Sequence, residues 1–376
     1  MTDRKIAIFS FFSGSGLLDL GFEKADFDIV FVNEYYSAFI KAYSYAREKM
    51  NILPPRFGYC NTDIGEYHNT RRLELQKSIL ECRREGYVIG FIGGPPCPDF
   101  SVGGKNKGRH GENGRLSQTY TDLIIKMKPD FFLFENVKGL WRTARHREFY
   151  EELKTALHTA GYCTTERLTN SIEFGVPQDR SRILLFGMKK SLLGRAHARG
   201  HDIIDFPWTS NMKYDTEKVF SLSWPSKNEF EVDNDIKVLK GLPQELTVEY
   251  WFRKNNVTLH PNNKAHFVPR KGIEKMRVIS EGDVSKKSYK RLHRWRYSPT
   301  AAYGNNEVHL HPYKERRISA AEAMAIQSLP ADFILPPDMS LTDMFKTIGN
   351  GVPFLLAKGI ANTIKEYLEE VALWRD

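Results

Sequence analysis

The chain has 376 residues, of which 41% are hydrophobic and 27% are charged, the proportions of an ordinary folded protein. No apolar run approaches the roughly 20 residues of a membrane-spanning helix, and no cleavable apolar signal follows Met1, so we expect a cytoplasmic protein without membrane segments. The net charge of +9 suits a polyanionic partner without requiring one.

Alternating short apolar runs and amphipathic segments fill the chain up to about residue 190, a pattern typical of βαβ units and a parallel sheet. We expect strands at residues 6–12, 29–33, 88–92, 131–135 and 183–187. Helices are expected at residues 17–24, 37–48, 71–85, 116–127 and 147–160.

The rhythm weakens between residues 191 and 305, where turn residues and tryptophans become frequent. We interpret this part as a second, smaller and loop-rich domain inserted into the first. Helices return at residues 319–328 and 352–372, so residues 306–376 are expected to complete the α/β domain formed by residues 1–190.

A glycine-containing turn, Phe12-Ser13-Gly14-Ser15-Gly16, follows the first expected strand. Glycines there let the backbone approach a ligand closely. An acidic side chain twenty residues after the first glycine, Glu34, suits ribose hydroxyls, and Asp63 suits an adenine amino group. The third glycine of a dinucleotide fingerprint is absent, because Asp19 stands in its place. This disfavours NAD and FAD and leaves room for a ligand without a pyrophosphate, such as S-adenosylmethionine.

The segment Gly93-Gly94-Pro95-Pro96-Cys97 ends another expected strand and presents a thiol at the sheet edge where α/β folds bind ligands. The alternative is a small buried hydrophobe, the usual role of a free cysteine. The four cysteines are far apart and form no Cys-x-x-Cys pair, which argues against a zinc site and a disulfide framework.

Charged groups lie at the ends of two further expected strands, after the first and before the second. Glu135 ends an apolar run, where a carboxylate is costly unless it is paired or lies in a cleft. Arg180 and Arg182, two residues apart, point to the same side and suit phosphate or carbonyl oxygens. A thiol, a carboxylate and two arginines on one sheet edge opposite an adenosine pocket indicate covalent group transfer.

In order along nearly the whole chain, these motifs resemble those of the DNA (cytosine-5) methyltransferases. The resemblance covers Phe-x-Gly-x-Gly at residues 12–16, Glu34, Asp63, Pro96-Cys97, Glu-Asn-Val at 135–137, Gln-x-Arg-x-Arg at 178–182, the segment 317–330 and Gly-Asn-x-Val-Pro at 349–353. It implies a Rossmann-like S-adenosylmethionine-dependent fold with a target-recognition domain at residues 191–305. It also implies methylation of carbon 5 of a cytosine that is flipped out of a specific duplex DNA sequence.

The family's site residues carry over motif by motif. Cys97 would attack carbon 6 of the cytosine, Glu135 would hold nitrogen 3 and the exocyclic amine, and Arg182, supported by Arg180, would hold the carbonyl oxygen. The implied cofactor residues are Phe12, Gly14, Gly16, Glu34, Asp63, Ile64, Pro96 and Asn350. The glycine-rich segment after the cysteine resembles the family's closing loop, with Ser101, Lys105, Lys107 and Arg109 as expected DNA contacts.

Two positions depart from the family's pattern. Pro98 replaces the usual glutamine after the catalytic cysteine, which removes an amide side chain and a backbone donor. Gly103 stands where some members carry a serine that fills the vacated base stack, so the filling residue is not identified.

The expected recognition domain contains a strongly basic stretch, residues 286–297, with six Lys or Arg and three aromatic residues in twelve. Such side chains neutralise phosphates, although they would equally suit a solvated basic surface. Arg253 lies in a segment whose side chains suit base edges. The predicted DNA contacts of this domain are Arg253, Lys287, Lys290, Arg291, Arg294 and Arg296.

The compact length resembles that of prokaryotic restriction–modification methyltransferases. We therefore expect a monomer whose genetic partner is a restriction endonuclease. The alternatives are an RNA cytosine-5 methyltransferase, a catalytically silent DNA-binding or regulatory homologue and, disfavoured by Asp19, a nicotinamide oxidoreductase.

Overall fold

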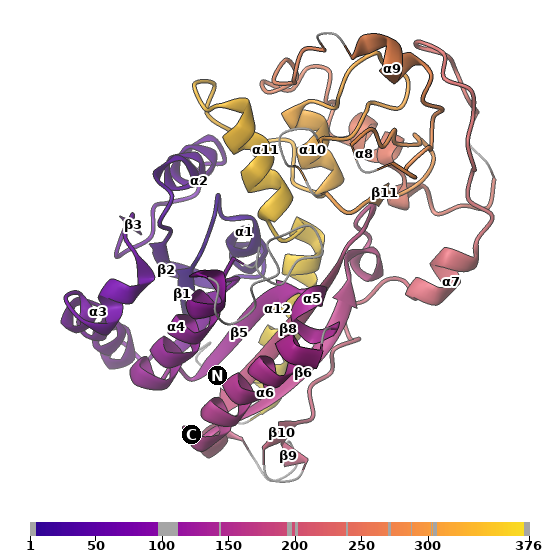
Figure 1. Cartoon of the computed structure of the whole chain (residues 1–376). Helices are drawn as coiled ribbons and strands as arrows, with labels where there is room; N and C mark the ends of the chain where they lie inside the picture. Colours follow the sequence, from indigo (N-terminus) through magenta and orange to yellow (C-terminus); the bar gives the residue numbers. More distant parts are fainter. Residues whose placement is uncertain are drawn as a thin grey trace.

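The computed structural model describes residues 5–96, 112–142, 144–193, 198–199, 202–237, 240–269, 272–286, 288–301, 303 and 307–371. Its main feature is a central nine-stranded sheet in the order β3-β2-β1-β4-β5-β8-β6-β10-β9 (Figure 1). These strands are β1 (Ile6–Phe11), β2 (Asp28–Asn33), β3 (Tyr59–Cys60), β4 (Val88–Gly93), β5 (Phe131–Val137), β6 (Tyr162–Asn170), β8 (Ser181–Lys189), β9 (Ala198–Arg199) and β10 (Ile203–Ile204). A separate two-stranded sheet joins β7 (Gln178–Asp179) to β11 (Ser298–Pro299).

Helices connect and cover the strands. The described helices are α1 (Leu17–Glu23), α2 (Ser37–Lys49), α3 (Arg72–Arg84), α4 (Glu112–Met127), α5 (Lys138–Arg142), α6 (Ala144–Thr159), α7 (Thr216–Ser221), α8 (Val248–Lys254), α9 (Ile273–Arg277), α10 (Ala320–Ile326), α11 (Leu341–Asn350) and α12 (Phe354–Glu370). Short 3₁₀ turns lie at Ile64–His68, Ser171–Phe174, Lys190–Leu192 and Gln244–Leu246. No described helix is both long and apolar enough to cross a bilayer.

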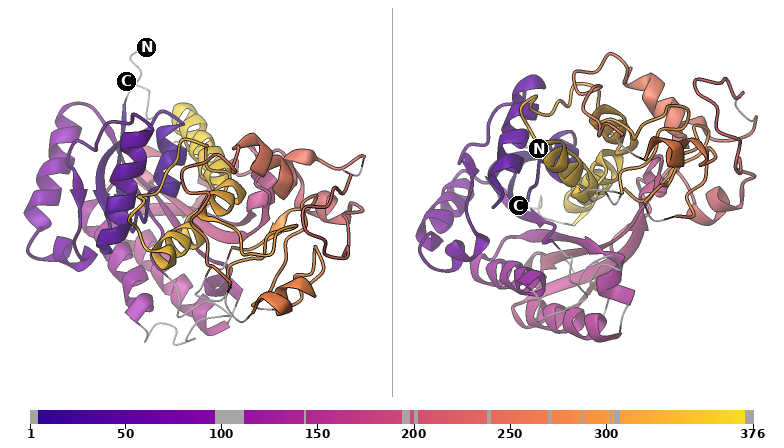
Figure 2. Two further views of the ribbon diagram at one scale, coloured as in Figure 1. Left: turned by 90° about the horizontal axis from the view of Figure 1, so that it is seen from above. Right: turned by 45° about the horizontal axis from the view of Figure 1, so that its top comes forward.

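Strands β1, β2, β4, β5 and β8 are buried on both faces over most of their length, which explains their continuous apolar runs. Helices α1 and α12 pack on one face, where Ile8 and Leu133 point. Helices α3, α4 and α6 pack on the other, where Phe9 and Phe132 point (Figures 1 and 2). The α/β class expected from the sequence is therefore confirmed, as are the five strands and the principal helices.

The expectation of a parallel sheet is wrong for one part of it. Strands β2, β1, β4 and β5 run parallel, but β8 pairs antiparallel with both β5 and β6. The apolar run of β8 reveals burial but carries no information on direction, because an inserted antiparallel strand is buried in the same way. The antiparallel direction places the start of β8 at the edge where β5 ends.

The chain after residue 190 first contributes to the central sheet. Ile203 pairs with Thr164 of β6, and Phe206 and Trp208 belong to the core beneath α12. Beyond them, the described chain up to α10 is mostly loops with short helices at one end of the sheet (Figure 2). Within that part, Trp251 and Phe252 of α8 share a core with α10 and α11. The division at residues 191 and 305 stays a prediction.

Candidate active site

The carboxyl ends of the parallel strands meet at one edge of the sheet, and most of the predicted site residues lie there. The turn at residues 12–16 follows β1, Glu34 follows β2, Gly94 follows β4 and Glu135 lies near the end of β5. Because β8 is antiparallel, Arg182 enters the same edge at the start of its strand. Cys97, Ser101, Lys105, Lys107 and Arg109 lie outside the described residues.

Glu135 and Arg182 form an ion pair at this edge. The Arg182 Nε lies 2.9 Å from the Glu135 Oε1, and their side chains are only 12% and 10% exposed. Val137 is opposite Arg182 in the β5–β8 register, so Glu135 lies diagonally across from Arg182 on the same face of the sheet. The pairing explains how a carboxylate is tolerated at the end of so apolar a strand.

Gly94 brings the chain that leads to the predicted nucleophile against this pair. A Cβ atom at Gly94 would lie 2.7 Å from the Glu135 Oε2, so a larger residue here would require the paired carboxylate to move. Pro95 is buried and Pro96 is exposed beyond it. The residue directly after Pro96 is Cys97, so the carboxylate is adjacent to the segment that carries the thiol.

Arg180 has different surroundings from Arg182. It is fully buried, and its guanidinium donates to the carbonyl oxygens of Ala301, Asn350 and Gly351 at 3.0–3.3 Å. Burial lowers the pKa of Arg180, and the neighbouring positive charge of Arg182 lowers it further. Arg180 therefore holds three chain segments together behind the site, which is compatible with the supporting role expected for it.

The turn after β1 has the backbone conformation that its glycines suggest. Phe12, Gly14 and Gly16 all have left-handed φ values, of 53°, 57° and 78°. A Cβ atom at Gly16 would come within 2.4 Å of the Tyr43 ring, so a larger residue is excluded there. These constraints place the backbone of the turn close to the sheet edge.

Glu34 lies beside this turn and is fixed by backbone donors. Its carboxylate accepts hydrogen bonds from the N–H groups of Gly14, at 2.9 Å, and Tyr36, at 2.8 Å. Burial raises the pKa of Glu34, although these backbone N–H groups oppose the shift. The arrangement leaves a half-buried carboxylate at the end of β2 whose remaining lone pairs suit hydroxyl groups.

The other predicted cofactor residues surround the same edge. Phe12 is half-buried, with its ring edge-on to Tyr120. The Asp63 carboxylate accepts from the Gly65 N–H at 2.7 Å, and Ile64 is buried in the core behind it. Asn350 ends α11 with an exposed side chain.

One element of the site is not predicted from the sequence. Asp19, which stands in place of a dinucleotide-binding glycine, lies fully buried beneath the turn and accepts hydrogen bonds from Ser10 and Tyr43. The available signal was an acidic residue inside an otherwise apolar helical turn, Leu17-Leu18-Asp19-Leu20.

Two of the predicted DNA contacts are contradicted by burial. The Arg291 side chain is fully buried and donates to the carbonyl oxygens of Met276, Ile279 and His311. Arg294 is 4% exposed and forms an ion pair at 2.8 Å with the buried Glu281. A guanidinium whose donors are satisfied inside the protein has none left for a phosphate, so both predictions are wrong.

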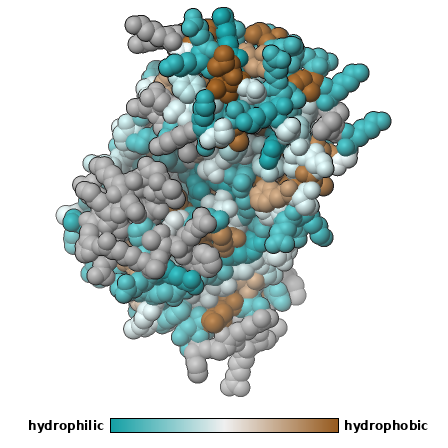
Figure 3. Space-filling view, turned by 45° about the vertical axis from the view of Figure 1, so that its right-hand side comes forward, coloured by the Kyte–Doolittle hydropathy of each residue, from teal (hydrophilic) through white to brown (hydrophobic). Residues whose placement is uncertain are grey.

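The remaining basic residues differ in accessibility. The Arg253 side chain is 67% exposed, although its Nε bonds to Glu249. Lys290 and Arg296 are half-buried, and Lys287 lies outside the described residues. On the face seen in Figure 3, hydrophobic side chains form separate patches among hydrophilic ones. Because their side chains are exposed or half-buried, Arg253, Lys290 and Arg296 stay as predicted DNA contacts.

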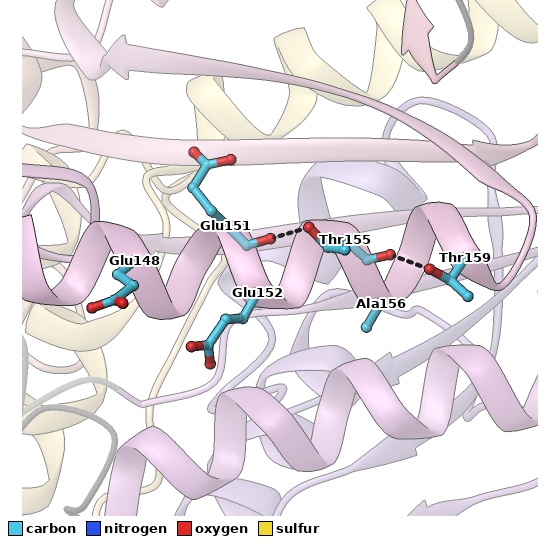
Figure 4. A pocket seen from close by; sticks show the side chains of 6 residues that line it. All are labelled: Glu148, Glu151, Glu152, Thr155, Ala156 and Thr159. Atoms are coloured by element: carbon cyan, nitrogen blue, oxygen red, sulfur yellow. Dashed lines mark hydrogen bonds between the residues drawn. The ribbon is translucent and has the colours of Figure 1, made fainter.

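A hollow on α6 lies apart from these residues. Figure 4 shows its lining residues, which all come from this one helix: Glu148, Glu151, Glu152, Thr155, Ala156 and Thr159. The hydroxyl groups of Thr155 and Thr159 donate to carbonyl oxygens one turn earlier, as in any solvated helix. None of the predicted site residues lines this hollow.

Known methyltransferases are similar to this chain in sequence. The chain is 55% identical to the Type II methyltransferase M.NmeDI of Neisseria meningitidis serogroup C, over 97% of this chain and 85% of that protein. It is 27% identical to the Type II methyltransferase M.MthTI of Methanothermobacter thermautotrophicus, over 97% of this chain and 98% of that protein.

Solved structures share the fold. A putative DNA modification methyltransferase from an E. coli prophage superposes with a TM-score of 0.62 at 21% identity, covering 97% of this chain and all of that one. The S. pombe Dnmt2 methyltransferase superposes with a TM-score of 0.61 at 13% identity, over 97% of this chain and 99% of that one.

The family model for C-5 cytosine-specific DNA methylases matches residues 6–366, from the first strand to the last helix. The matched range contains every motif on which the resemblance was based. The chain belongs to the C-5 cytosine-specific DNA methylase family and is a methyltransferase that acts on carbon 5 of cytosine in DNA.

Proposed function

We propose that the chain transfers a methyl group from S-adenosylmethionine to carbon 5 of a cytosine within one specific duplex DNA sequence. It would act as a monomer in the prokaryotic cytosol and protect that sequence from a restriction endonuclease. The buried Glu135–Arg182 ion pair next to Gly94, three residues before Cys97, is the observation that carries the proposal. The Type II methyltransferase names of the relatives support the restriction–modification context.

The cytosine has to leave the duplex before it can reach this site. Unstacking and unpairing one base costs a few kcal/mol, which protein contacts to the flanking strand must offset. The ion pair offers a flipped base both an acceptor, the Glu135 carboxylate, and a donor, the Arg182 guanidinium. Nitrogen 3 and the exocyclic amine would bind Glu135, and the carbonyl oxygen would bind Arg182.

The reaction begins with the Cys97 thiolate. Its sulfur forms a bond to carbon 6, and the electron pair of the 5,6 double bond moves to carbon 5 and into the ring. Glu135 favours this step by holding a proton at nitrogen 3 as negative charge develops there. Carbon 5 would then bond to the methyl carbon as the methyl–sulfur bond of the sulfonium donor breaks, leaving its electron pair on that sulfur. Loss of the carbon 5 proton returns an electron pair that restores the double bond and expels the Cys97 sulfur.

The turn after β1 and its surroundings fit the methyl donor. Gly14 and Gly16 bring the backbone close to the sheet edge, and the half-buried Glu34 carboxylate suits two ribose hydroxyls. Phe12 would offer apolar surface to an adenine ring, with Asp63 at its amino group and the buried Ile64 behind Asp63. Pro96 and Asn350 would contact the methionine end. When bound, S-adenosylmethionine supplies an electrophilic methyl group.

Transfer of a tritiated methyl group to duplex DNA and to tRNA tests the substrate, and bisulfite sequencing of plasmid from expressing cells identifies the modified cytosine. We expect incorporation into DNA only, and a stable adduct with DNA that contains 5-fluorocytosine. Cys97→Ala should abolish both while retaining DNA affinity. Incorporation into tRNA alone would indicate an RNA methyltransferase, and DNA binding without an adduct would indicate a silent homologue.

A further inference from the structure

The cofactor turn rests on a buried acid that the proposed reaction does not use. Asp19 has no exposed surface and lies three residues after Gly16, in the first turn of α1. Its Oδ1 accepts from the Ser10 hydroxyl at 2.9 Å, and its Oδ2 accepts from the Tyr43 hydroxyl at 3.0 Å. Two donors on two oxygens are the arrangement that stabilises an ionised carboxylate.

A chain of hydroxyl groups connects this carboxylate to the turn. The Ser10 hydroxyl donates to Asp19 and lies 2.8 Å from the Ser13 hydroxyl, which also bonds to the Asn33 carbonyl oxygen at 3.2 Å. A hydrogen-bond chain that ends on a carboxylate is polarised and strengthened along its length. Ser13, the second residue of the turn, is thereby tied to Asp19.

Each further residue of the turn is fixed by a different element. These contacts are the Gly14 N–H to the Glu34 carboxylate at 2.9 Å, the Ser15 hydroxyl to the Thr347 hydroxyl at 2.7 Å, and the Gly16 carbonyl to the Arg47 guanidinium at 2.7 Å. Arg47 is 1% exposed and stacks over the Tyr43 ring, which itself bonds to Asp19. The two ends of the turn are therefore held by one buried cluster.

The charges of this cluster do not balance. Arg47 forms an ion pair at 2.8 Å with Glu23, whose side chain is 13% exposed, so the negative charge of Asp19 is in excess. The other titratable groups that face Asp19 are the phenols of Tyr43, Tyr59 and Tyr120. Burial accordingly raises the pKa of Asp19 to about 7, which the charge of Arg47 only partly opposes. Such an excess buried charge lowers the stability of the fold.

We propose that Asp19 is a positioning residue: its buried carboxylate holds the turn at residues 13–16 in the conformation that binds the methyl donor, at a cost in folding stability. A neutral amide would remove the excess charge, and its nitrogen could donate to the oxygen of one of the two hydroxyl groups, so stability alone does not require a carboxylate here. This inference rests on the proposed role of the turn in binding S-adenosylmethionine.

The test compares Asp19→Asn with Tyr43→Phe, which keeps the ring and removes one donor. Asp28→Asn is the matched control, because Asp28 lies exposed on the neighbouring strand β2. We would measure kcat and the KM for S-adenosylmethionine with duplex DNA, the calorimetric Kd of S-adenosylmethionine, and the melting temperature at pH 8.

For Asp19→Asn we expect about a tenfold rise in KM and Kd, the scale of one lost charged hydrogen bond. The kcat at saturating S-adenosylmethionine should stay within about threefold, because no reacting atom is touched. The melting temperature should equal or exceed that of the wild type. Tyr43→Phe should raise KM by a smaller factor, and Asp28→Asn should change none of these values.

Unchanged KM and Kd in both Asp19→Asn and Tyr43→Phe would overturn the inference. A lower melting temperature of Asp19→Asn together with weaker binding of S-adenosylmethionine would overturn it as well, because Asp19 would then stabilise the fold as a whole. If the wild type itself neither bound S-adenosylmethionine nor methylated DNA, the proposed function would fail first, which is a distinct result.

Discussion

Glu135 and Arg182 meet across the antiparallel β5–β8 pair, with 2.9 Å between Oε1 and Nε. Their side chains are diagonal neighbours on one face of the sheet, and each is about nine-tenths buried. Each charge is therefore tolerated because of the other. The same pair presents an acceptor and a fork of donors at the sheet edge, so its stability and its proposed role in binding cytosine are linked.

Replacing Glu135 by Gln should slow methyl transfer by about 10²-fold, the scale of a lost general acid–base contribution. The amide keeps the shape but cannot hold a proton at nitrogen 3 of the cytosine. Single-turnover methyl transfer at saturating DNA and S-adenosylmethionine measures this rate. Glu166→Gln is the control, since Glu166 pairs with Lys154 and belongs to no predicted site. Equal rates for the wild type and Glu135→Gln would contradict the role of this carboxylate.

Glu34→Gln should raise the KM for S-adenosylmethionine about tenfold, with kcat nearly unchanged. The amide nitrogen would face the N–H group of Gly14 or Tyr36, so one backbone donor would lose its acceptor, at a cost of about 1–3 kcal/mol. Burial raises the pKa of Glu34, so this carboxylate takes up a proton at a higher pH than an exposed carboxylate does. Binding of S-adenosylmethionine to the wild type should therefore weaken as the pH falls through that range. Initial rates across pH check both expectations, with the exposed Glu48→Gln as control. A change in kcat with an unchanged KM would contradict a role of Glu34 in binding S-adenosylmethionine.

Arg294→Ala and Lys290→Ala should separate folding from DNA binding. Removing Arg294 leaves the Glu281 charge buried, with side-chain exposure of 1%, and such a loss costs about 3–5 kcal/mol. Lys290→Ala should leave stability unchanged, weaken DNA binding and reduce the slope of log K against log salt by about 1. Urea denaturation and salt-dependent fluorescence anisotropy measure the two effects. A stable Arg294→Ala with a reduced salt slope would restore Arg294 as a phosphate contact.

Acid should destabilise the protein through two buried histidines. Burial lowers the pKa of His293 to about 4 and that of His309 to about 3, below the ordinary value near 6.5. Both are neutral in the fold, and the His293 Nδ1 accepts the Trp295 N–H, so protonation would break that bond.

The unfolded chain takes up these protons first as the pH falls below about 6.5. The contribution of the two neutral histidines to the free energy of unfolding is therefore complete above that pH and is lost as the pH falls toward 4. Free energies of unfolding between pH 8 and pH 4 test this, and His293→Gln should flatten the dependence by up to about 1.4 kcal/mol per pH unit. An unaltered profile would show that His293 is not the responsible group.

Much of the fold follows from local sequence patterns. The apolar runs of β1, β2, β4, β5 and β8 predict their strands because a strand covered on both faces has to be apolar throughout. The direction of β8 and the presence of the two-residue strands β9 and β10 are not predictable in this way. Strand direction depends on how the chain returns to the sheet, and two residues carry no periodicity.

The order and chemistry of the site motifs were determined by the sequence itself, because a thiol, a carboxylate and paired arginines at strand ends specify a reaction class wherever the strands lie side by side. Which charges face solvent was decided only by tertiary packing. Arg291, Arg294 and Lys290 look alike in a basic stretch, yet the first two bond to groups inside the protein. Asp19 likewise gains its partners from β1 and α2, elements that only folding brings together.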